Sequence, residues 1–168
     1  IGRGLVASPN DFGVKGDAPT HPELLDFLAN ELIGSGWQIK ALHRLIMNSA
    51  AYQQGADASE TNLKRDAENK LFWFRPAKRL EAEAIRDSLL AVAGRLDPKM
   101  FGPSESTAES QRRSVYLRVK RSELIPFLTL FDAPEPTASI GDRGATTVPT
   151  QALTMMNSPF VQIGRAHV

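Results

Sequence analysis

The sequence predicts a mainly α-helical fold, an irregular helical domain with a short β-strand pair. Several segments repeat apolar residues at helical spacing and are bounded by capping residues, Gly or Pro. One segment, "SVYLRVKR", instead alternates apolar and polar residues with the two-residue period of a strand. The content of 42% hydrophobic and 23% charged residues is ordinary for a globular protein. Helix should therefore exceed strand by a wide margin.

The first two helices are predicted to form a hairpin after an irregular lead-in that ends near Ala18. Thr20 and Glu23 have the spacing of a capping box at the start of the first helix. The "GSG" segment ends this helix, and the second runs from about Gln38 to Ala50. The apolar face of the first helix comprises Leu24, Leu25, Leu28 and Leu32. Two amphipathic helices with so short a connection are expected to run antiparallel.

The longest helix is predicted in the middle of the chain, after a polar loop over residues 53–68. It should begin near Ala77 and end near Gly94. Its buried face is expected to comprise Ala82, Ile85, Leu89, Val92 and Ala93. The alternating segment follows a second loop, and Val115, Leu117 and Val119 would form the buried side of its strand.

Two shorter helices are expected near the end of the chain. Ser122 is placed to cap the apolar segment "ELIPFLTLF", which "DAPEP" ends. The last helix should run from about Val148 to Met156, with Thr146 and Thr147 at its N-cap.

We expect one domain over residues 1–162, belonging to a longer protein of metagenomic origin. The chain begins at Ile1 with neither a methionine nor a signal peptide. Its last residues, "IGRAHV", are those encoded by ATC GGA AGA GCA CAC GTC, the start of a widely used sequencing adapter. Residues 163–168 are therefore expected to be an adapter-derived tail and to take no part in the fold.

Composition limits the classes of function. The net charge of +1 gives no overall attraction to nucleic acid or acidic lipid. Cysteine is absent, which excludes disulfides, thiolate zinc sites, a cysteine nucleophile and c-type haem attachment within this chain. No apolar run approaches the about 20 residues of a membrane span.

The order of the motifs resembles one family over nearly the whole chain, from Gly2 to Val161. The motifs are "GRGLVASPNDFG", "HPELLDFLANELIGSGWQIKALHRLIMNSAAY", "NKLFWFRPAKRLEAEAIRDSLLAVAGRL", "RRSVYLRVKR", "FDAPEP" and "TTVPTQALTMMNSPF". They are similar to the C-terminal domain of unknown function 1553 of planctomycete-type bacterial proteins. The resemblance implies an exported, extracytoplasmic protein, periplasmic or at the cell surface, with haem c in an upstream cytochrome c module. It also implies lineages that degrade complex polysaccharides.

Two histidines are weak candidates for a metal or acid–base site. His21 lies in the first turn of one predicted helix and His43 on the next, so the hairpin could bring them together. The sequence lacks an H-x-x-x-H spacing, and we favour capping and packing roles for both.

The long helix carries four candidates for structural ion pairs: Arg79, Glu83, Arg86 and Asp87. Their i, i+3 and i, i+4 spacings favour a salt-bridge ladder. Glu83 and Asp87 could instead act as paired carboxylates, although we find no facing acid. A basic set around Tyr116 is a weak nucleic-acid signal that the net charge opposes: Arg113, Arg118, Lys120 and Arg121.

The stretch "RGATTVPTQALTMMNSPF" supplies the anion-binding candidates: Arg143, Thr146, Thr147 and Gln151. An arginine beside the free N–H groups of a helix start suits a sulfate, phosphate or carboxylate. Its structural alternative, which we favour, is an internal ion pair with Asp132 or Asp142.

We find no catalytic set of residues, which favours an interaction or structural module. The alternative is a carbohydrate- or sulfated-glycan-related enzyme or binding domain. The expected partners are other domains of the same polypeptide, a glycan or a redox partner.

Overall fold

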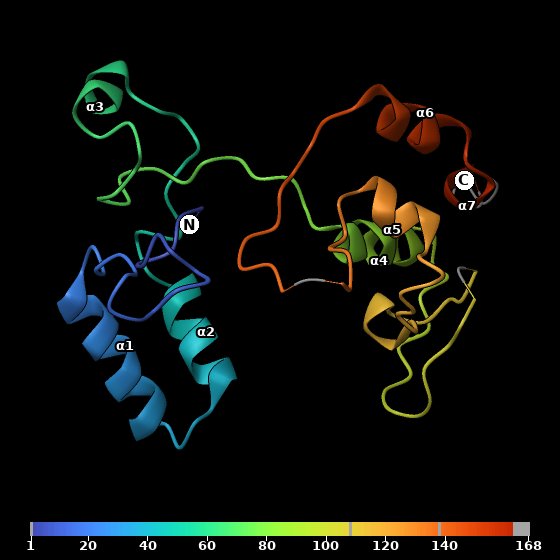
Figure 1. Cartoon of the computed structure of the whole chain (residues 1–168), viewed down its shortest axis with the longest axis horizontal. Coiled ribbons are helices and arrows are strands. Elements are labelled where there is room, and N and C mark those ends of the chain that lie inside the picture. Colours follow the sequence, from blue (N-terminus) through green and yellow to red (C-terminus); the bar gives the residue numbers. More distant parts are fainter. Residues whose placement is uncertain (1, 108, 138, 163–168) are drawn as a thin grey trace. The chain divides into compact units, whose positions relative to one another are not determined.

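A computed structural model describes residues 2–107, 109–137 and 139–162 of the chain. The predicted fold class is confirmed, since these residues are 38% helical with 4% strand. The contacts divide the chain into two compact units, an N-terminal unit, Ile1–Lys78, and a C-terminal unit, Arg79–Val168. Figure 1 shows the helices of each unit, which we describe separately. The expected adapter-derived tail, residues 163–168, lies outside the described residues.

The N-terminal unit is built on the predicted hairpin of α1, Pro22–Gly34, and α2, Ile39–Met47 (Figure 1). The predicted end of α1 is confirmed: the Gly36 and Trp37 amides donate to the Ile33 and Leu32 carbonyls, at 3.0 and 2.9 Å. This is a Schellman closure, and both Gly36 and Trp37 have positive φ.

The start of α1 differs from the prediction. Its N-cap is His21, and no side chain caps the helix. The predicted capping box is wrong because Thr20 is used elsewhere: its amide and its hydroxyl both donate to the Leu5 carbonyl, at 2.9 and 3.3 Å. Thr20 thus ties the irregular lead-in to the start of the helix.

The rest of the N-terminal unit contains a helix that the sequence did not predict. α3, Glu60–Arg65, lies within the expected polar loop. Asn69 is buried after it, and its side-chain oxygen accepts hydrogen bonds from the Trp73 and Phe74 amides, at 3.0 and 3.4 Å. Its side-chain amide donates to the Phe74 carbonyl at 2.8 Å, so Asn69 shapes the turn that buries Phe72.

The C-terminal unit contains α4, Ala82–Val92, which begins later than predicted. Glu81 is extended, and the preceding Arg79 reaches away to the Phe131 carbonyl at 3.0 Å. The predicted end near Gly94 is confirmed. The expected buried face is wrong in part, because Val92 is 92% exposed. The buried residues of α4 are Ala82, Arg86 and Leu90, at i, i+4 and i+8.

The predicted strand is reduced to isolated bridges. Residues Ser114–Tyr116 form a 3₁₀ turn, η1, and Leu117 bridges to Glu105. Val115 and Val119 are exposed, so the expected buried side keeps only Leu117. One reason is that side chains of α4 bind main-chain groups at the start of this segment and just before it. The Ser114 amide, for example, donates to Asp87 at 2.8 Å instead of to a neighbouring strand.

Three helices complete the C-terminal unit: α5, Pro126–Leu130, α6, Pro149–Asn157, and α7, Pro159–Gln162. The predicted caps are wrong for α5 and α6, whose N-caps are Ile125 and Val148 instead of Ser122 and the threonine pair. A proline at the first position starts each of these two helices, because its missing N–H needs no partner there.

Candidate functional site

Arg86 is the most deeply buried large side chain among the described residues, with 1% exposure. It donates to the carbonyls of Ser110 and Arg112, the latter at 3.0 Å, and lies 3.4 Å from the Ser114 hydroxyl oxygen. Burial lowers the pKa of the Arg86 guanidinium, and the negative charge of the neighbouring Asp87 partly offsets this lowering. Arg86 therefore fixes residues 110–114, which lead into the segment predicted to be a strand.

Asp87 works beside Arg86 on the same segment. Its Oδ1 accepts from both the amide and the hydroxyl of Ser114, at 2.8 and 2.7 Å, and lies 3.7 Å from the Arg86 guanidinium. Arg86 and Asp87 are thus near each other, but the predicted salt bridge along the helix is not the main contact of either side chain. Both side chains mainly fix main-chain groups of a segment 24–28 residues further along.

Arg79 and Asp132 form a close ion pair in the C-terminal unit, with 2.6 Å between guanidinium and carboxylate. Asp132 also accepts from the amide and the hydroxyl of Thr146, each at 2.8 Å. Asp132 has a positive φ of 63° directly after α5, so the chain turns there and the carboxylate meets Thr146. The Thr146 amide first, then Arg79 and the Thr146 hydroxyl, hold the pKa of Asp132 below its usual 3.8.

Arg143 pairs with two glutamates at the start of α4. Its guanidinium lies 3.1 Å from Glu81 and 2.8 Å from Glu83. Arg143 thus forms an internal ion pair, as we favoured, but its partners are Glu81 and Glu83 and not Asp132, which pairs with Arg79. Because Glu81 is extended and α4 begins only at Ala82, Arg79 does not lie one helical turn before Glu83, as a helix beginning at Ala77 would have placed it.

The other anion-binding candidates also contact protein groups. Gln151 is buried, donates to the Leu130 carbonyl at 2.9 Å and accepts from the Val148 amide at 3.4 Å. Thr146 is bound to Asp132, whereas Thr147 is exposed. These contacts use most of the polar atoms that an anion would need. Anion binding by this set stays a prediction.

A polar groove of about 360 Å³ borders the Arg143 pair. Its charged lining comprises Glu83, Glu123 and Glu135 with Arg118, Lys120 and Arg143, above an apolar floor from α5 and the residues before it. Lys120 pairs with Glu123 at 3.1 Å, so the cations and carboxylates of the groove are balanced. The groove suits a polar ligand of little net charge better than a strong anion.

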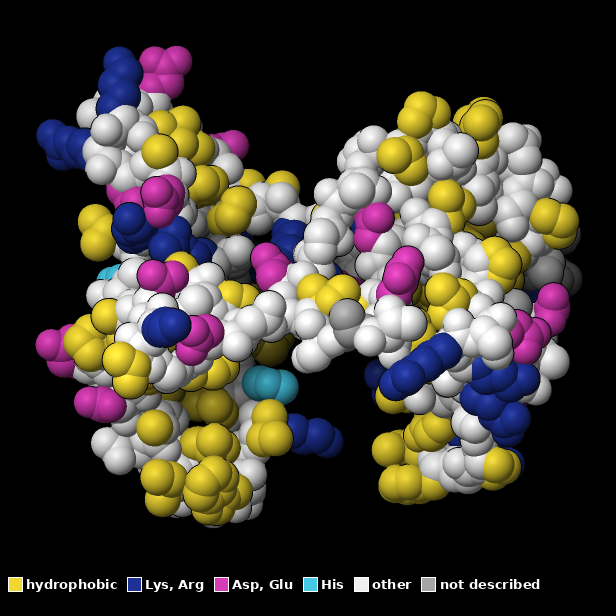
Figure 2. All heavy atoms as spheres, viewed as in Figure 1, with side chains coloured by type: hydrophobic (Ala, Val, Ile, Leu, Met, Phe, Trp, Pro, Cys, Tyr) yellow, Lys and Arg dark blue, Asp and Glu magenta, His cyan; other side chains and the backbone are white. Residues whose placement is uncertain are grey.

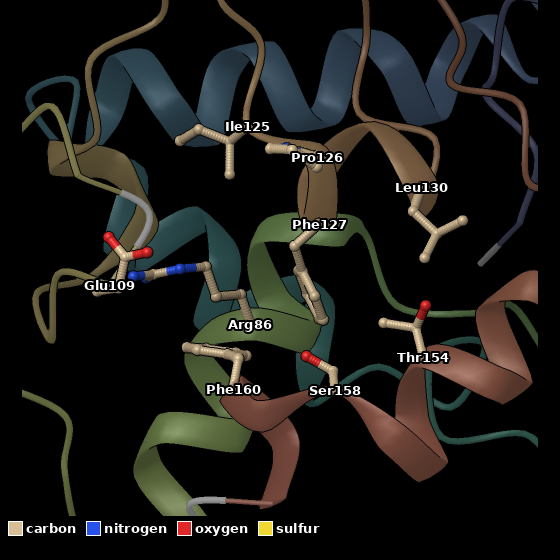
Figure 3. Close-up of a pocket in the computed structure, with 9 residues that line it drawn as sticks. All are labelled: Arg86, Glu109, Ile125, Pro126, Phe127, Leu130, Thr154, Ser158 and Phe160. Atoms are coloured by element: carbon tan, nitrogen blue, oxygen red, sulfur yellow. The ribbon is translucent and has the colours of Figure 1, made fainter.

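A second, mostly apolar cavity of about 260 Å³ lies between α4, α5, α6 and α7 (Figure 3). Phe127 and Phe160 line it, with their ring centroids 5.3 Å apart. Arg86 reaches the same cavity, and in Figure 3 its side chain points toward Glu109. Because Arg86 is bound to main-chain carbonyls, its role at this cavity is to form a wall.

The two candidate metal-binding histidines lie in the N-terminal unit. His21 stacks on Phe72 at 5.2 Å between centroids, and its Nδ1 lies 3.0 Å from the Thr20 hydroxyl. His43 is exposed on α2. Within the described ranges, no group of three or more His, Asp or Glu side chains is placed to hold a metal ion.

Sequence reasoning missed a second buried arginine. The Arg112 side chain is 7% exposed, donates to the Phe101 and Pro103 carbonyls at 2.6 and 3.0 Å, and stacks 3.9 Å from the centre of the Tyr116 ring. It organises the loop that follows Asp97. No local pattern marks it, because an arginine is ordinarily exposed.

In the part of the chain that the structure describes, no helix combines the length and the apolarity needed to cross a bilayer. Neither a curated protein nor a solved structure matches the chain. Residues 1–166 match the PSD1 family, described as a protein of unknown function (DUF1553), and the chain therefore belongs to this family.

Proposed function

We propose that this chain is an interaction and structural module of an exported bacterial protein that carries a cytochrome c module upstream. The observation that carries the interaction role is the apolar surface of the α1–α2 hairpin. We call it the hairpin surface and define it by eight side chains that are 39–70% exposed: Leu24, Leu25, Phe27, Ile33, Trp37, Ile39, Leu45 and Met47. Figure 2 shows hydrophobic side chains gathered over the end of the hairpin where α1 and α2 are joined.

Covering this surface would release a substantial free energy. Trp37 is 70% exposed, which corresponds to roughly 100–170 Å² of a large aromatic side chain. At about 25 cal/mol per Å², covering Trp37 alone is worth roughly 3–4 kcal/mol. Apolar patches of this kind mark interaction sites, whereas single exposed apolar residues need no explanation.

The structural role is supported by the charged residues of the C-terminal unit. Arg79, Arg86 and Arg112 each donate to main-chain carbonyls of distant segments. Such contacts hold irregular segments in place where no sheet does so. Cysteine is absent from this chain, so the haem c of the proposed upstream module would be attached outside it.

Oxidative footprinting tests the interaction role. Trp37 and Met47 should react readily with hydroxyl radicals in the dilute isolated chain and several-fold more slowly in the assembled full-length protein. Met100, which is 62% exposed in the C-terminal unit against 53% for Met47, is a matched control. Equal reactivity of Trp37 and Met47 in both samples would refute the interaction role.

Binding of a neutral or sulfated glycan is the second candidate, and the charge balance of the polar groove favours a neutral one. A thermal-shift screen against neutral and sulfated oligosaccharides tests it. A ligand of the groove should raise the melting temperature of the parent but not that of Arg118→Ala/Lys120→Ala. A shift of equal size in both would place binding elsewhere.

A further inference from the structure

We infer that the hairpin surface is an interface between two copies of this chain, in which two α1–α2 hairpins pair about a twofold axis with α1 of each copy against α2 of the other. This inference rests on the proposed interaction role and names the partner. It would complete a four-helix bundle from two hairpins.

The first argument is that the hairpin lacks a second layer. The structure describes all of α1 and α2, and neither helix contains a buried residue. Exposed large apolar residues recur eight residues apart on each helix, Leu25 and Ile33 on α1 and Ile39 and Met47 on α2. An amphipathic helix gains its stability from packing such a stripe against a neighbour. A second hairpin supplies a surface with the same spacing.

The second argument is charge complementarity. α1 carries Glu23, Asp26 and Glu31 and no Lys or Arg, whereas α2 carries Lys40 and Arg44 and no Asp or Glu. These side chains are exposed. A twofold arrangement with α1 against the partner's α2 brings opposite charges together at both symmetry-related contacts. Pairing α1 with α1 would bring acidic residues together, so the charges select one arrangement.

The third argument comes from Trp37 at the tip of the hairpin. Its φ of 63° is a left-handed conformation that costs a non-glycine residue energy, while its side chain points into solvent with 70% exposure. The Schellman closure needs only the Trp37 amide, so a glycine would serve the turn without strain. The indole therefore adds nothing to the turn, and large exposed aromatics are typical anchors of interfaces.

The amount of surface is adequate for a dimer. A stable interface buries roughly 800 Å² on each partner. The eight side chains of the hairpin surface are each 39–70% exposed. Together with the charged residues that flank them, they offer an accessible surface on the order of 800 Å². We therefore expect a reversible dimer with a dissociation constant on the order of micromolar.

Sedimentation velocity on the isolated chain, over a hundredfold range of concentration, tests the inference. The parent should pass from monomer to dimer. An all-acidic hairpin, Lys40→Glu/Arg44→Glu, and an all-basic hairpin, Glu23→Lys/Asp26→Lys/Glu31→Lys, should each stay monomeric. An equimolar mixture of the two variants should form a heterodimer, because each acidic helix then meets a basic one. Circular dichroism establishes that both variants fold.

The contribution of Trp37 has a matched control in the same chain. Trp37→Gly should raise the dissociation constant about tenfold or more while preserving the helical content. Phe101 has the same φ of 63° and a similar exposure of 75%, but lies in the C-terminal unit. Phe101→Gly should leave the dissociation constant unchanged. An equal effect of the two substitutions would overturn the assignment of the interface to the hairpin.

Footprinting separates the failure of this inference from that of the proposed function. If the second-copy assignment is correct, Trp37 of the isolated chain becomes protected as its own concentration rises. If Trp37 is protected only in the full-length protein, the partner is another segment and the second-copy inference is wrong while the interaction role stands. If Trp37 is protected in neither sample, both are wrong.

Discussion

Replacing Arg86 by methionine is expected to destabilise the C-terminal unit more than any replacement of Arg143. Arg86 is 1% exposed and supplies the charged donor to the Ser110 and Arg112 carbonyls. A hydrogen bond to a charged group contributes about 1.5–3 kcal/mol, so the loss of two gives roughly 3–5 kcal/mol. Methionine fills much of the vacated volume, which keeps the cavity contribution small.

Arg143→Met is the matched comparison because the substitution is chemically identical. The Arg143 side chain is 36% exposed and its partners Glu81 and Glu83 are 62% and 35% exposed. Solvent screens such pairs, and their loss costs about 0–1 kcal/mol. The expected loss of unfolding free energy is therefore several-fold larger for Arg86 than for Arg143, although the sequence marked both as candidates for ion pairs.

Urea unfolding followed by far-UV circular dichroism measures the difference. Tryptophan fluorescence is unsuitable, because Trp37 and Trp73, the two tryptophans of the chain, both lie in the N-terminal unit. With an m-value of about 2 kcal/mol/M, Arg86→Met should lower the midpoint by about 2 M and Arg143→Met by less than about 0.5 M. A midpoint for Arg86→Met within about 0.5 M of the parent would refute the reasoning. So would a larger loss for Arg143→Met.

Three further predictions follow from named contacts. The pKa of Asp132 is lowered in the folded chain, so its contribution to stability is present above the usual 3.8 and is lost as the pH falls below that value; Asp132→Asn should flatten the dependence of melting temperature on pH there, and an unchanged acid limb would contradict this. Gln151→Ala should cost about 1–2 kcal/mol in urea unfolding, because the buried Leu130 carbonyl loses its donor, whereas Thr147→Ala, at an exposed neighbour, should be neutral. Asn69→Ala should cost about 2–3 kcal/mol, because the Trp73 amide loses its acceptor and a φ of 53° suits Asn better than Ala. The unfolding transition followed by tryptophan fluorescence measures this loss. An unchanged transition would show that Asn69 does not hold the turn.

Local pattern was sufficient for the helical class and for the helix ends that depend on main-chain geometry. The apolar period predicted the α1–α2 hairpin, and the glycines predicted its closure, because a left-handed turn after a helix is a local requirement. The same reasoning predicted the end of α4 near Gly94. It overestimated the length of α4, since Arg79 looks like an ordinary helical residue until its distant partners are known.

The same distinction between local pattern and tertiary structure applies to the charged residues. The sequence by itself identified Arg79, Glu83, Arg86, Asp87, Asp132 and Arg143 as residues that need partners, since charges seldom stay unpaired inside a protein. Only the tertiary structure decided the pairing: Arg79 with Asp132, Arg143 with Glu81 and Glu83, and Arg86 with main-chain carbonyls. Spacing along a helix restricts partners to the same helix, whereas these partners lie 24–62 residues away. The start of the lost strand has the same cause. Side chains from α4 bind the Ser110 and Arg112 carbonyls and the Ser114 amide, which no periodicity in "SVYLRVKR" could reveal.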